Sequence, residues 1–408
     1  MRNSLQGLTA EVWVVDNASN DGSLPFLQPL FPEVFFIESK ENVGFAKANN
    51  LALQQAKGNF ILYLNPDTLL PENCLHACLS FFKVKPDAGA IGIRMVDGSG
   101  TFLRESKRAF PSPLTSFFKL VGLSVIFPTS PIFARYQLGH LSCTETHVVD
   151  VLAGAFMMMR RDVVEKTGGF DERFFMYGED IDLSYRIQKT LMPNGKSHWQ
   201  NYYFAGSSIV HFKGESTKKG SLNYVKLFYK AMGQFVEKHY ASYTAKLFSI
   251  LLYAGIMVRA FFSLIYRFIP KLLSISGLRQ SADRKGVINE NKDMDACRQT
   301  LVAGTMDDYR TIEKILTAHS FQNHLTGRLS AHIGDKENAL MPLTDWIKNL
   351  QDYPATDLIF CMSSNLTMEQ IMPMLKRHKG LCYKFHYAGS SSIVSSDDSN
   401  LAGEVVSM

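Results

Sequence analysis

Four short polar clusters hold the residues whose types and spacing could carry chemistry. The first follows the apolar run 11–15 and includes Asp16, Asn17, Ser19 and Asp21. A carboxylate fixed after a strand can accept the imide N–H of uracil or thymine, and the Asp-Gly-Ser turn offers backbone N–H groups to an anion. We therefore interpret the cluster as a nucleotide contact, with a simple cap and turn as the alternative.

The second cluster spans residues 41–50 and combines Asn42, Gly44 and Phe45. A tight turn at Gly44 that leads into a helix would present backbone N–H groups, which suits an anion or a ribose. The alternative is an ordinary loop followed by an N-cap.

The third cluster ends the apolar run 60–64 with Asn65 and Asp67. Side chains two residues apart in an extended segment point to the same side, so this amide and carboxylate can share one hard cation. The remaining ligands of that cation would be diphosphate oxygens.

The fourth cluster, residues 169–186, crowds acidic residues and arginines beside aromatic ones around a predicted helix start at Glu179 and Asp180. Acidic residues at a helix start often only complement the helix dipole. This cluster holds more charge than a helix start needs, and it ends at Arg186.

The elements that must position these clusters alternate along the first part of the chain. Apolar and β-branched runs predict strands, and apolar spacing of three and four predicts helices. Alternation of this kind implies a largely parallel sheet covered by helices, with the ligand site at the carboxyl ends of the strands. The strands are expected at 11–15, 34–38, 60–65 and 89–95, and the helices at 49–56 and 71–85.

Residues 101–146 show no period and predict an irregular insertion, and order is expected to return at 148–159. A short helix closed by Gly168 and Gly169 then precedes the predicted helix start near Glu179. A second, smaller strand-and-helix unit is expected after residue 297. Its strands are predicted at 301–305 and 358–361 and its helices at 307–316 and 367–376.

Residues 247–269 form an apolar stretch long enough to cross a bilayer, yet it contains Arg259 and Arg267. On a helical wheel these arginines, Lys246 and Lys271 fall within one arc of about 140°. This pattern favours an amphipathic helix on a membrane surface. A spanning or re-entrant segment and a plain core or oligomer helix are the alternatives.

The net charge of +5 is concentrated in residues 211–280, which hold 11 Lys or Arg against 2 Asp or Glu. Such a patch suits an anionic membrane, whereas no aromatic-interleaved groove or reading helix indicates nucleic acid. The 46% apolar and 20% charged residues exclude a disordered or fibrous chain. Six cysteines in so long a chain indicate a reducing compartment. The spacing of Cys74 and Cys78 favours a buried helix face, and a metal-binding pair is the alternative.

Taken in order over residues 10–240, the four clusters resemble the inverting family 2 glycosyltransferases of GT-A fold, in particular the rhamnosyltransferase-like branch. By this resemblance Asp16 holds the nucleotide base and the turn from Asn42 to Phe45 lies near the donor. Asn65-Pro66-Asp67 resembles the metal motif of the family, with Asp67 as the metal ligand. Asp180 matches the catalytic base and Glu179 its orienting neighbour. His211 matches a further metal ligand, so a magnesium or manganese cofactor is implied.

The chain departs from the family pattern at its start, because the family opens with a strand and an aromatic-polar turn before the segment where this sequence begins. The predicted fold is therefore a GT-A sheet that lacks its first strand. This departure keeps a second hypothesis open, a catalytically impaired scaffold or sensor protein of a polysaccharide assembly system.

The last part of the chain more loosely resembles the Rossmann-like domain of bacterial polyprenol-phosphate sugar transferases. Gly304 alone remains of a glycine-rich phosphate loop. The resemblance thus favours a regulatory or docking role over nucleotide binding for this unit.

These expectations give an α/β protein with a GT-A domain at 1–240, an amphipathic membrane helix at 241–275, a linker at 276–296 and a Rossmann-like domain at 297–408. The resemblance implies transfer of rhamnose or a similar sugar, with inversion, from a dTDP- or UDP-linked donor to a polyprenol-diphosphate-linked glycan. It places the protein at the cytoplasmic face of a bacterial inner membrane and leaves a homo-oligomer open. Asn17, Ser19, Asp21, Asn65 and Arg186 complete the expected donor contacts.

Overall fold

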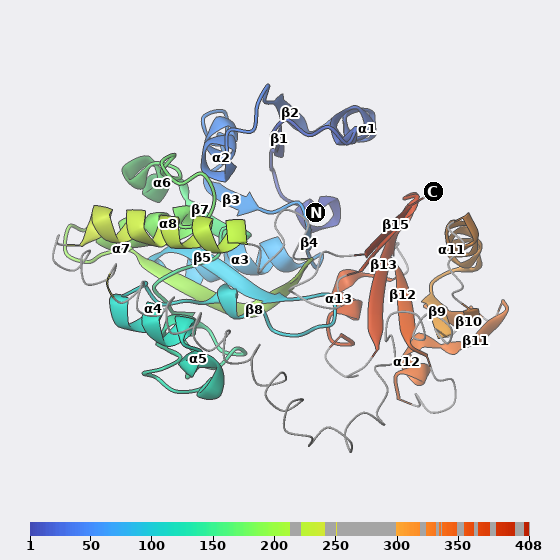
Figure 1. Ribbon diagram of the computed structural model, residues 1–408. Helices are drawn as coiled ribbons and strands as arrows, with labels where there is room; N and C mark the ends of the chain where they lie inside the picture. The colour runs from blue at the N-terminus through green and yellow to red at the C-terminus, as the bar shows by residue number, and fades with distance from the viewer. Residues whose placement is uncertain are drawn as a thin grey trace, which may run out of the picture.

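The computed structural model of the protein contains two α/β units, each built around its own sheet (Figure 1). Both units combine strands and helices, which confirms the predicted α/β fold class. The structure describes residues 1–212, 222–240, 250, 299–318, 324–331, 334–335, 337–348, 355–362, 366–375, 381–395 and 404–407.

The chain starts with a small two-stranded parallel sheet. Strand β1 (Trp13–Asp16) pairs with β2 (Phe35–Glu38), and α1 (Ser23–Leu30) connects the two. The rings of Trp13 and Phe35 stack at 4.5 Å. In the described part of the chain β1 and β2 pair with no other strand, so they stand apart from the larger sheet.

The larger sheet of the first unit has the order β3-β7-β5-β8-β4, with β6 paired to β8. It is mixed, as predicted, but only β5 and β8 are paired in parallel. The expected largely parallel pairing was wrong because β7 lies antiparallel between β3 and β5. The strands are β3 (Phe60–Leu64), β4 (Thr68–Leu69), β5 (Ala88–Val96), β6 (His147–Val148), β7 (Phe156–Arg160) and β8 (Gln200–His211).

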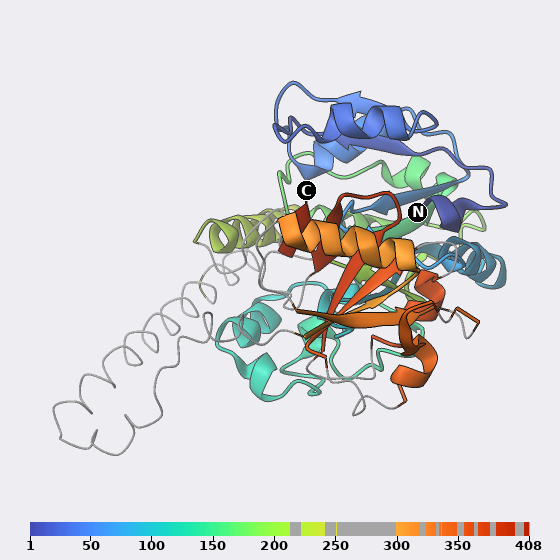
Figure 2. The same cartoon turned by 90° about the vertical axis from the view of Figure 1, so that its right-hand side faces the viewer.

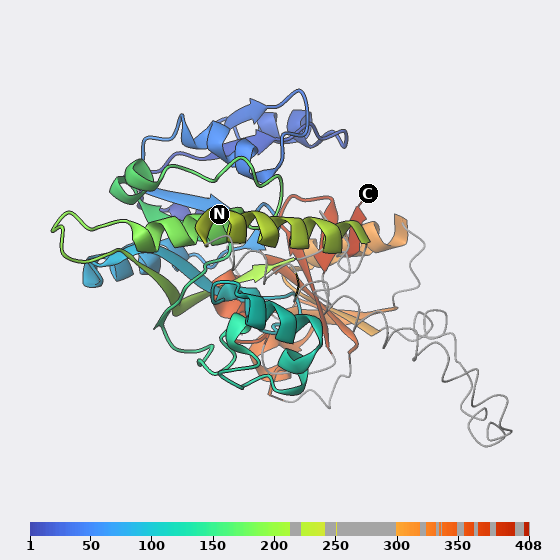
Figure 3. The same ribbon diagram turned by 60° about the vertical axis from the view of Figure 1, so that its left-hand side comes forward.

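Helices cover both faces of this sheet. On one face α3 (Cys74–Val84) fully buries Cys74 and Cys78, which confirms the predicted buried helix face. The other face packs against α2 (Phe45–Leu53), α6 (Arg161–Thr167) and α7 (Glu179–Lys189). Figure 3 shows α8 (Leu222–His239) crossing in front of the sheet.

The segment 101–146 is more ordered than expected. It contains α4 (Pro113–Leu120), α5 (Leu123–Ile126) and two short 3-10 turns. Ser112 accepts the Thr115 N–H and Pro113 opens α4, a strong N-terminal signal. The prediction of an irregular insertion missed these two helices, because helices of four and eight residues are too short to show a period in sequence.

The second unit is built on a seven-stranded sheet of order β11-β10-β9-β12-β13-β14-β15. Its pairs are parallel from β11 to β13 and antiparallel beyond. Figure 2 shows α11 (Met306–Ala318) lying along this sheet. The other elements are β9 (Gln299–Ala303), β10 (His324–Ser330), β11 (Ala339–Pro342), α12 (Leu343–Trp346), β12 (Asp357–Met362), α13 (Met368–Ile371), β13 (Cys382–Tyr387), β14 (Ser392–Ser395) and β15 (Glu404–Ser407).

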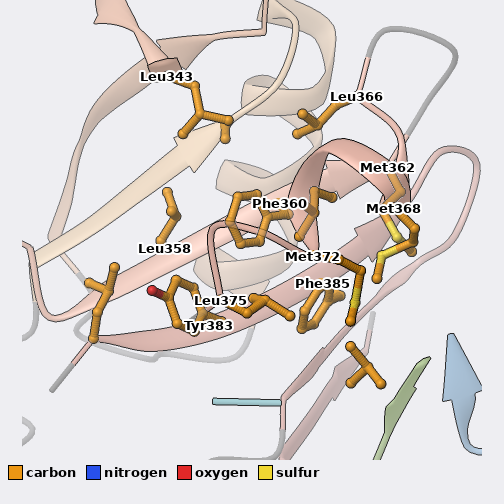
Figure 4. Packing of buried hydrophobic residues seen from close by; sticks show 14 of the residues in the cluster. Leu343, Leu358, Phe360, Met362, Leu366, Met368, Met372, Leu375, Tyr383 and Phe385 are labelled. Atoms are coloured by element: carbon orange, nitrogen blue, oxygen red, sulfur yellow. The ribbon is translucent and has the colours of Figure 1, made fainter. Parts of the chain in front are cut away.

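The two units share one apolar core. Val96, Val210 and Phe212 of the first unit pack into the cluster that Figure 4 shows around Phe360 and Phe385. The rings of Phe212 and Phe385 meet edge to face at 5.4 Å. Glu72 also accepts the backbone N–H groups at positions 368 and 369, so a carboxylate of the first unit caps α13.

The membrane predictions fall almost entirely outside the described residues. The apolar stretch 247–269 and the linker 276–296 are not described, apart from Ile250. Among the helices that the structure describes, none has the length and apolar character to cross a membrane.

Candidate functional site

Three of the four predicted clusters meet at Gly154 and Ala155, the residues that lead into β7. The Gly154 N–H donates to Asp180 Oδ2 at 3.3 Å, and the Ala155 carbonyl accepts the Asn65 N–H at 3.0 Å. A Cβ built on Gly154 would lie 3.6 Å from the Phe45 ring. Residues that are far apart in sequence therefore surround one short segment.

Asp180 is held by an ion pair that the sequence did not predict. Arg108 Nη2 donates to Asp180 Oδ2 at 2.5 Å, and both side chains are 13% exposed. Asp180 Oδ1 accepts the Ile181 N–H at the start of α7. The carboxylate is thus oriented on both oxygens, while a small part of it stays accessible.

Glu179 lies next to Asp180 but has a different environment. It is buried, and its Oε2 has no hydrogen-bond partner among the described residues. Burial, together with the charge of Asp180, raises the pKa of Glu179 to about 8. At neutral pH Glu179 therefore carries a proton, and the pair offers one neutral acid beside one carboxylate.

Asn65, Asp67 and His211 come together where β3 ends and β8 ends. Asp67 Oδ1 lies 3.2 Å from His211 Nε2, and Asn65 Nδ2 lies 3.4 Å from the same nitrogen. The Asp67 carbonyl accepts the Phe212 N–H, which fixes this loop against β8. The predicted partnership of Asp67 and His211 is therefore a contact in the structure.

Asp67 and His211 could hold a divalent cation, which would then need further ligands from outside this group. The 3.2 Å between Asp67 Oδ1 and His211 Nε2 would allow both atoms to reach one ion. Asn65 Oδ1 is buried nearby without a hydrogen-bond partner in the described part of the chain. No group of three or more His, Cys, Asp or Glu among the described residues could hold a metal by itself.

The loops after β1 and β2 are joined by amide side chains. Asn17 donates to Asn42 Oδ1 at 3.0 Å and accepts the Val43 N–H at 2.9 Å. Gly44 adopts a φ of +85°, and a Cβ there would lie 2.6 Å from the Phe175 carbonyl oxygen, so only glycine fits. This turn links the first two clusters to the fourth.

Asp16 ends β1 and is half-buried, whereas Ser19 and Asp21 lie exposed in the loop that follows. Asp16 accepts the Ser19 N–H at 3.1 Å, and Asp21 accepts from both the backbone and the hydroxyl of Ser23. The hydroxyl of Ser23 lowers the pKa of Asp21. No hydrogen bond or ion pair among the described residues joins these three to Asp180. The predicted role of Asp16 in holding the base, and those of Ser19 and Asp21 in binding the donor, stay predictions.

Arg186 lies elsewhere. Its guanidinium donates to Asp182 at 2.7 Å and to the carbonyls of Thr167 and Gly169. Lys238 and His239 of α8 contact the same buried Asp182. These contacts tie α7 to the preceding loop and to α8. No hydrogen bond in the described part of the chain joins Arg186 to the other predicted donor contacts, so its role at the donor stays a prediction.

Sequence reasoning missed Arg108, Tyr136 and Gly154. Tyr136 is buried beside Arg108 and Asp180, and burial raises its pKa. No motif marked Arg108 or Tyr136, because both belong to the segment without a period.

Residues 2–168 match the profile of the family Glycosyl transferase family 2. The chain is 29% identical over 233 residues to the N-acetylglucosaminyl-diphospho-decaprenol L-rhamnosyltransferase of Mycobacterium tuberculosis H37Rv. The aligned region covers 54% of this chain and 72% of that protein. It is 30% identical over 151 residues to rhamnosyltransferase WbbL of Escherichia coli K12, covering 35% of this chain and 54% of WbbL.

Among solved structures, the chain is similar to the mannosyltransferase PcManGT of Pyrobaculum calidifontis, in complex with GDP-Man and Mn2+. That likeness has a TM-score of 0.35 and 16% identity and covers 74% of each chain. A second structure, GalNAc-T7 with UDP, GalNAc and Mn2+, gives a TM-score of 0.37 and 16% identity over 57% of this chain and 44% of that chain. Residues 2–168 are thus similar to family 2 glycosyltransferases, and the chain is similar to rhamnosyltransferases.

Proposed function

We propose that this glycosyltransferase domain moves rhamnose or a similar sugar, with inversion, from a dTDP- or UDP-linked donor to a hydroxyl of a polyprenol-diphosphate-linked glycan. The names of the two rhamnosyltransferase relatives support the sugar and the lipid-linked acceptor. The observation that carries the proposal is that Asp180 and Asn65 bond to the adjacent residues Gly154 and Ala155, while the side chains of Asn65 and Asp67 contact His211.

Asp180 is the residue we assign to accept the proton of the acceptor hydroxyl as that oxygen attacks C1 of the donor sugar. Arg108 orients the carboxylate, and Gly154 holds its position through a backbone N–H. One attack on the face opposite the diphosphate inverts the anomeric centre. No second carboxylate has to activate the leaving group, because the diphosphate is already a good one.

Asp67 and His211 are the residues that would hold a magnesium or manganese ion, with Asn65 beside them. Such an ion, when bound, neutralises negative charge that develops on the diphosphate. In the proposal Asn17, Asn42 and Gly44, which are joined by hydrogen bonds, form a further wall of the donor site. In bacteria this reaction would take place at the cytoplasmic face of the inner membrane, during synthesis of a surface polysaccharide.

The alternative of a catalytically impaired scaffold or sensor rests on one observation. β1 and β2, which lead into the proposed donor loops, are not paired with the six-stranded sheet. If the small sheet does not hold those loops in place, the polar residues are present but cannot bind a nucleotide.

Thermal unfolding with UDP, dTDP, GDP and CMP, each with and without manganese, separates the two hypotheses. A ligand at 100 times its Kd stabilises the folded state by about 2.7 kcal/mol, so binding raises Tm measurably. The transferase proposal predicts a manganese-dependent rise for one nucleotide that is lost in Asp67→Ala. Asp162→Ala, which removes an exposed carboxylate from the first turn of α6, should keep the rise. No rise with any nucleotide would favour the scaffold hypothesis.

A further inference from the structure

Five large apolar side chains are exposed on the segment that contains α4 and α5. We define the apolar hairpin as residues 110–136. It contains α4 and α5, and the chain turns between these two helices at Gly122 (φ +84°). In Figures 1 and 3 these two helices lie at the edge of the first unit. The exposed side chains and their exposed fractions are Leu114 (53%), Val125 (73%), Ile126 (67%), Phe127 (47%) and Ile132 (61%).

The hairpin is a built structure and not a loose loop. Its two ends are joined by a hydrogen bond of 2.9 Å from the Ala109 N–H to the Tyr136 carbonyl. Inside it the Phe133 ring contacts Phe118 at 5.0 Å and Phe127 at 5.3 Å. Phe127 therefore belongs to a small aromatic core with part of its ring exposed. It and the other four side chains are exposed although water normally drives such side chains to be buried.

The charges around the hairpin indicate what covers these side chains. Residues 106–144 contain no Asp or Glu, whereas Lys119 and Arg135 are exposed. Lys119 lies 4.5 Å from the centre of the Tyr136 ring, so its charge stays at the base of the hairpin. Apolar and aromatic side chains that project from a surface beside basic residues match the interface of an anionic bilayer.

The base of the hairpin adjoins the proposed acceptor site. Arg108 is two residues before the hairpin and pairs with Asp180, and Tyr136 at its other end packs beside Arg108. The hairpin therefore connects its outer face, where a membrane would lie, to the segment that orients the carboxylate we assign to the acceptor hydroxyl.

We propose that the apolar hairpin inserts Val125, Ile126 and Phe127 into the surface of an anionic lipid bilayer and so presents the lipid-linked acceptor to Asp180. The acceptor part rests on the proposed function, but lipid contact does not. A second copy of the chain, or the segment 241–298 of the same chain, is the competing occupant of this surface.

Tryptophan quenching by brominated lipid tests the contact at the residue itself. Phe127→Trp would be mixed with vesicles of phosphatidylglycerol and phosphatidylethanolamine, with or without bromine on the acyl chains. The wild type, with its own Trp13, Trp199 and Trp346, gives the background. Val84→Trp is the matched control, because Val84 is 75% exposed at the end of α3. The proposal predicts bromine quenching above background for Phe127→Trp and none for Val84→Trp.

Vesicle co-sedimentation gives a second readout. The double variant Val125→Asp with Ile126→Asp should lower the partition coefficient about tenfold or more, because burying one large aliphatic side chain is worth at least that much. Val84→Asp should leave it unchanged. All three substituted positions are exposed, so the variants should fold. Their far-ultraviolet circular dichroism should match that of the wild type.

Three results would overturn the proposal. The chain could fail to bind vesicles, it could bind them while quenching of the Phe127→Trp variant stays at background, or it could form a dimer in sedimentation velocity that Val125→Asp dissociates. Failure of the proposed function would look different. Sugar transfer would be absent from the wild type while the hairpin still showed quenching, since the vesicle assays need neither donor nor turnover.

Discussion

Arg108 and Asp180 form an ion pair at 2.5 Å between residues 72 positions apart in sequence. It links the segment before α4 to the start of α7, so the residue that we assign as base takes its orientation from outside the clusters that the sequence revealed. The pair is mostly buried, and Arg108 also donates to the Leu152 carbonyl at 3.1 Å. Arg108 is therefore a positioning residue for Asp180.

Replacing Arg108 should impair turnover more than nucleotide binding. Arg108→Ala is expected to lower kcat about 100-fold, since correct placement of a general base is worth about two to four orders of magnitude. Arg108→Lys should restore part of the loss. Removal of one partner of a buried pair also costs about 3 kcal/mol of stability. Kinetics at a temperature where the variant is folded, together with nucleotide titration, check this. A rise in KM with an unchanged kcat would contradict the positioning role.

The environment of Glu179 predicts a stability that depends on pH. Its pKa is about 8 in the folded protein against 4.5 for an unperturbed carboxyl, so the folded state keeps a proton that the unfolded chain releases. The stabilising effect of this proton is complete below pH 4.5 and is lost as the pH rises through 8.

Glu179→Gln mimics the protonated side chain at every pH. The variant should match the wild type in free energy of unfolding near pH 5 and exceed it near pH 9, by about 1.4 kcal/mol for each unit of pKa shift. Denaturant unfolding at both pH values measures this difference. A constant offset between the two proteins from pH 5 to pH 9 would show that Glu179 titrates normally.

Metal removal should act through Asp67 and His211. His211→Ala is expected to raise the manganese concentration needed for half-maximal transfer about 10-fold or more, because loss of one ligand weakens a site that has few protein ligands. His76→Ala is the control, since His76 lies on α3 and contacts only the Gln6 carbonyl among the described hydrogen bonds. Full wild-type activity in chelator would exclude the cation from the reaction.

The contact between the two units can be tested at Gly100. Its φ is +82°, and a Cβ there would lie 2.3 Å from the Leu375 carbonyl oxygen in the second unit. Gly122 has nearly the same φ of +84° with nothing within 4 Å of that position. Gly122→Ala should therefore cost only about 1–2 kcal/mol of conformational strain. Gly100→Ala should cost clearly more, and equal losses in denaturant unfolding would mean that the units do not pack as described.

Much of this site could be predicted because its residues lie next to regular elements. Asn65 follows β3, Asp180 is the second residue of α7 and His211 ends β8, so periodicity and turn signals locate each of them. Arg108 could not be found in this way, because only the tertiary fold brings it to Asp180. Arg186 carried the right charge near the fourth cluster, yet its proximity to Asp182 on α7 decides its contacts.

The packing of the two units against each other could not be predicted from the sequence either. Phe212 and Phe385 are apolar residues of different sheets, and no pattern in either segment indicates that their rings meet. The sequence did predict the alternation of strands and helices in the second unit, since β9 and β12 are apolar runs followed by helices. The antiparallel insertion of β7 was missed because a buried strand reads the same in either direction.

The most direct test of the account is a transfer assay with labelled dTDP-rhamnose and UDP-linked sugars on a polyprenol-diphosphate-linked N-acetylglucosamine acceptor, with the product's anomeric configuration read by NMR. We predict one inverted glycosidic product, and a fall of about 1,000-fold in kcat for Asp180→Asn, as expected for removal of a general base. Asp162 is the matched control, because its Oδ1 accepts the N–H of the following residue at the start of a helix, as Asp180 Oδ1 does. Asp162→Asn should therefore retain full activity. A retained configuration, or wild-type turnover by Asp180→Asn, would contradict the account.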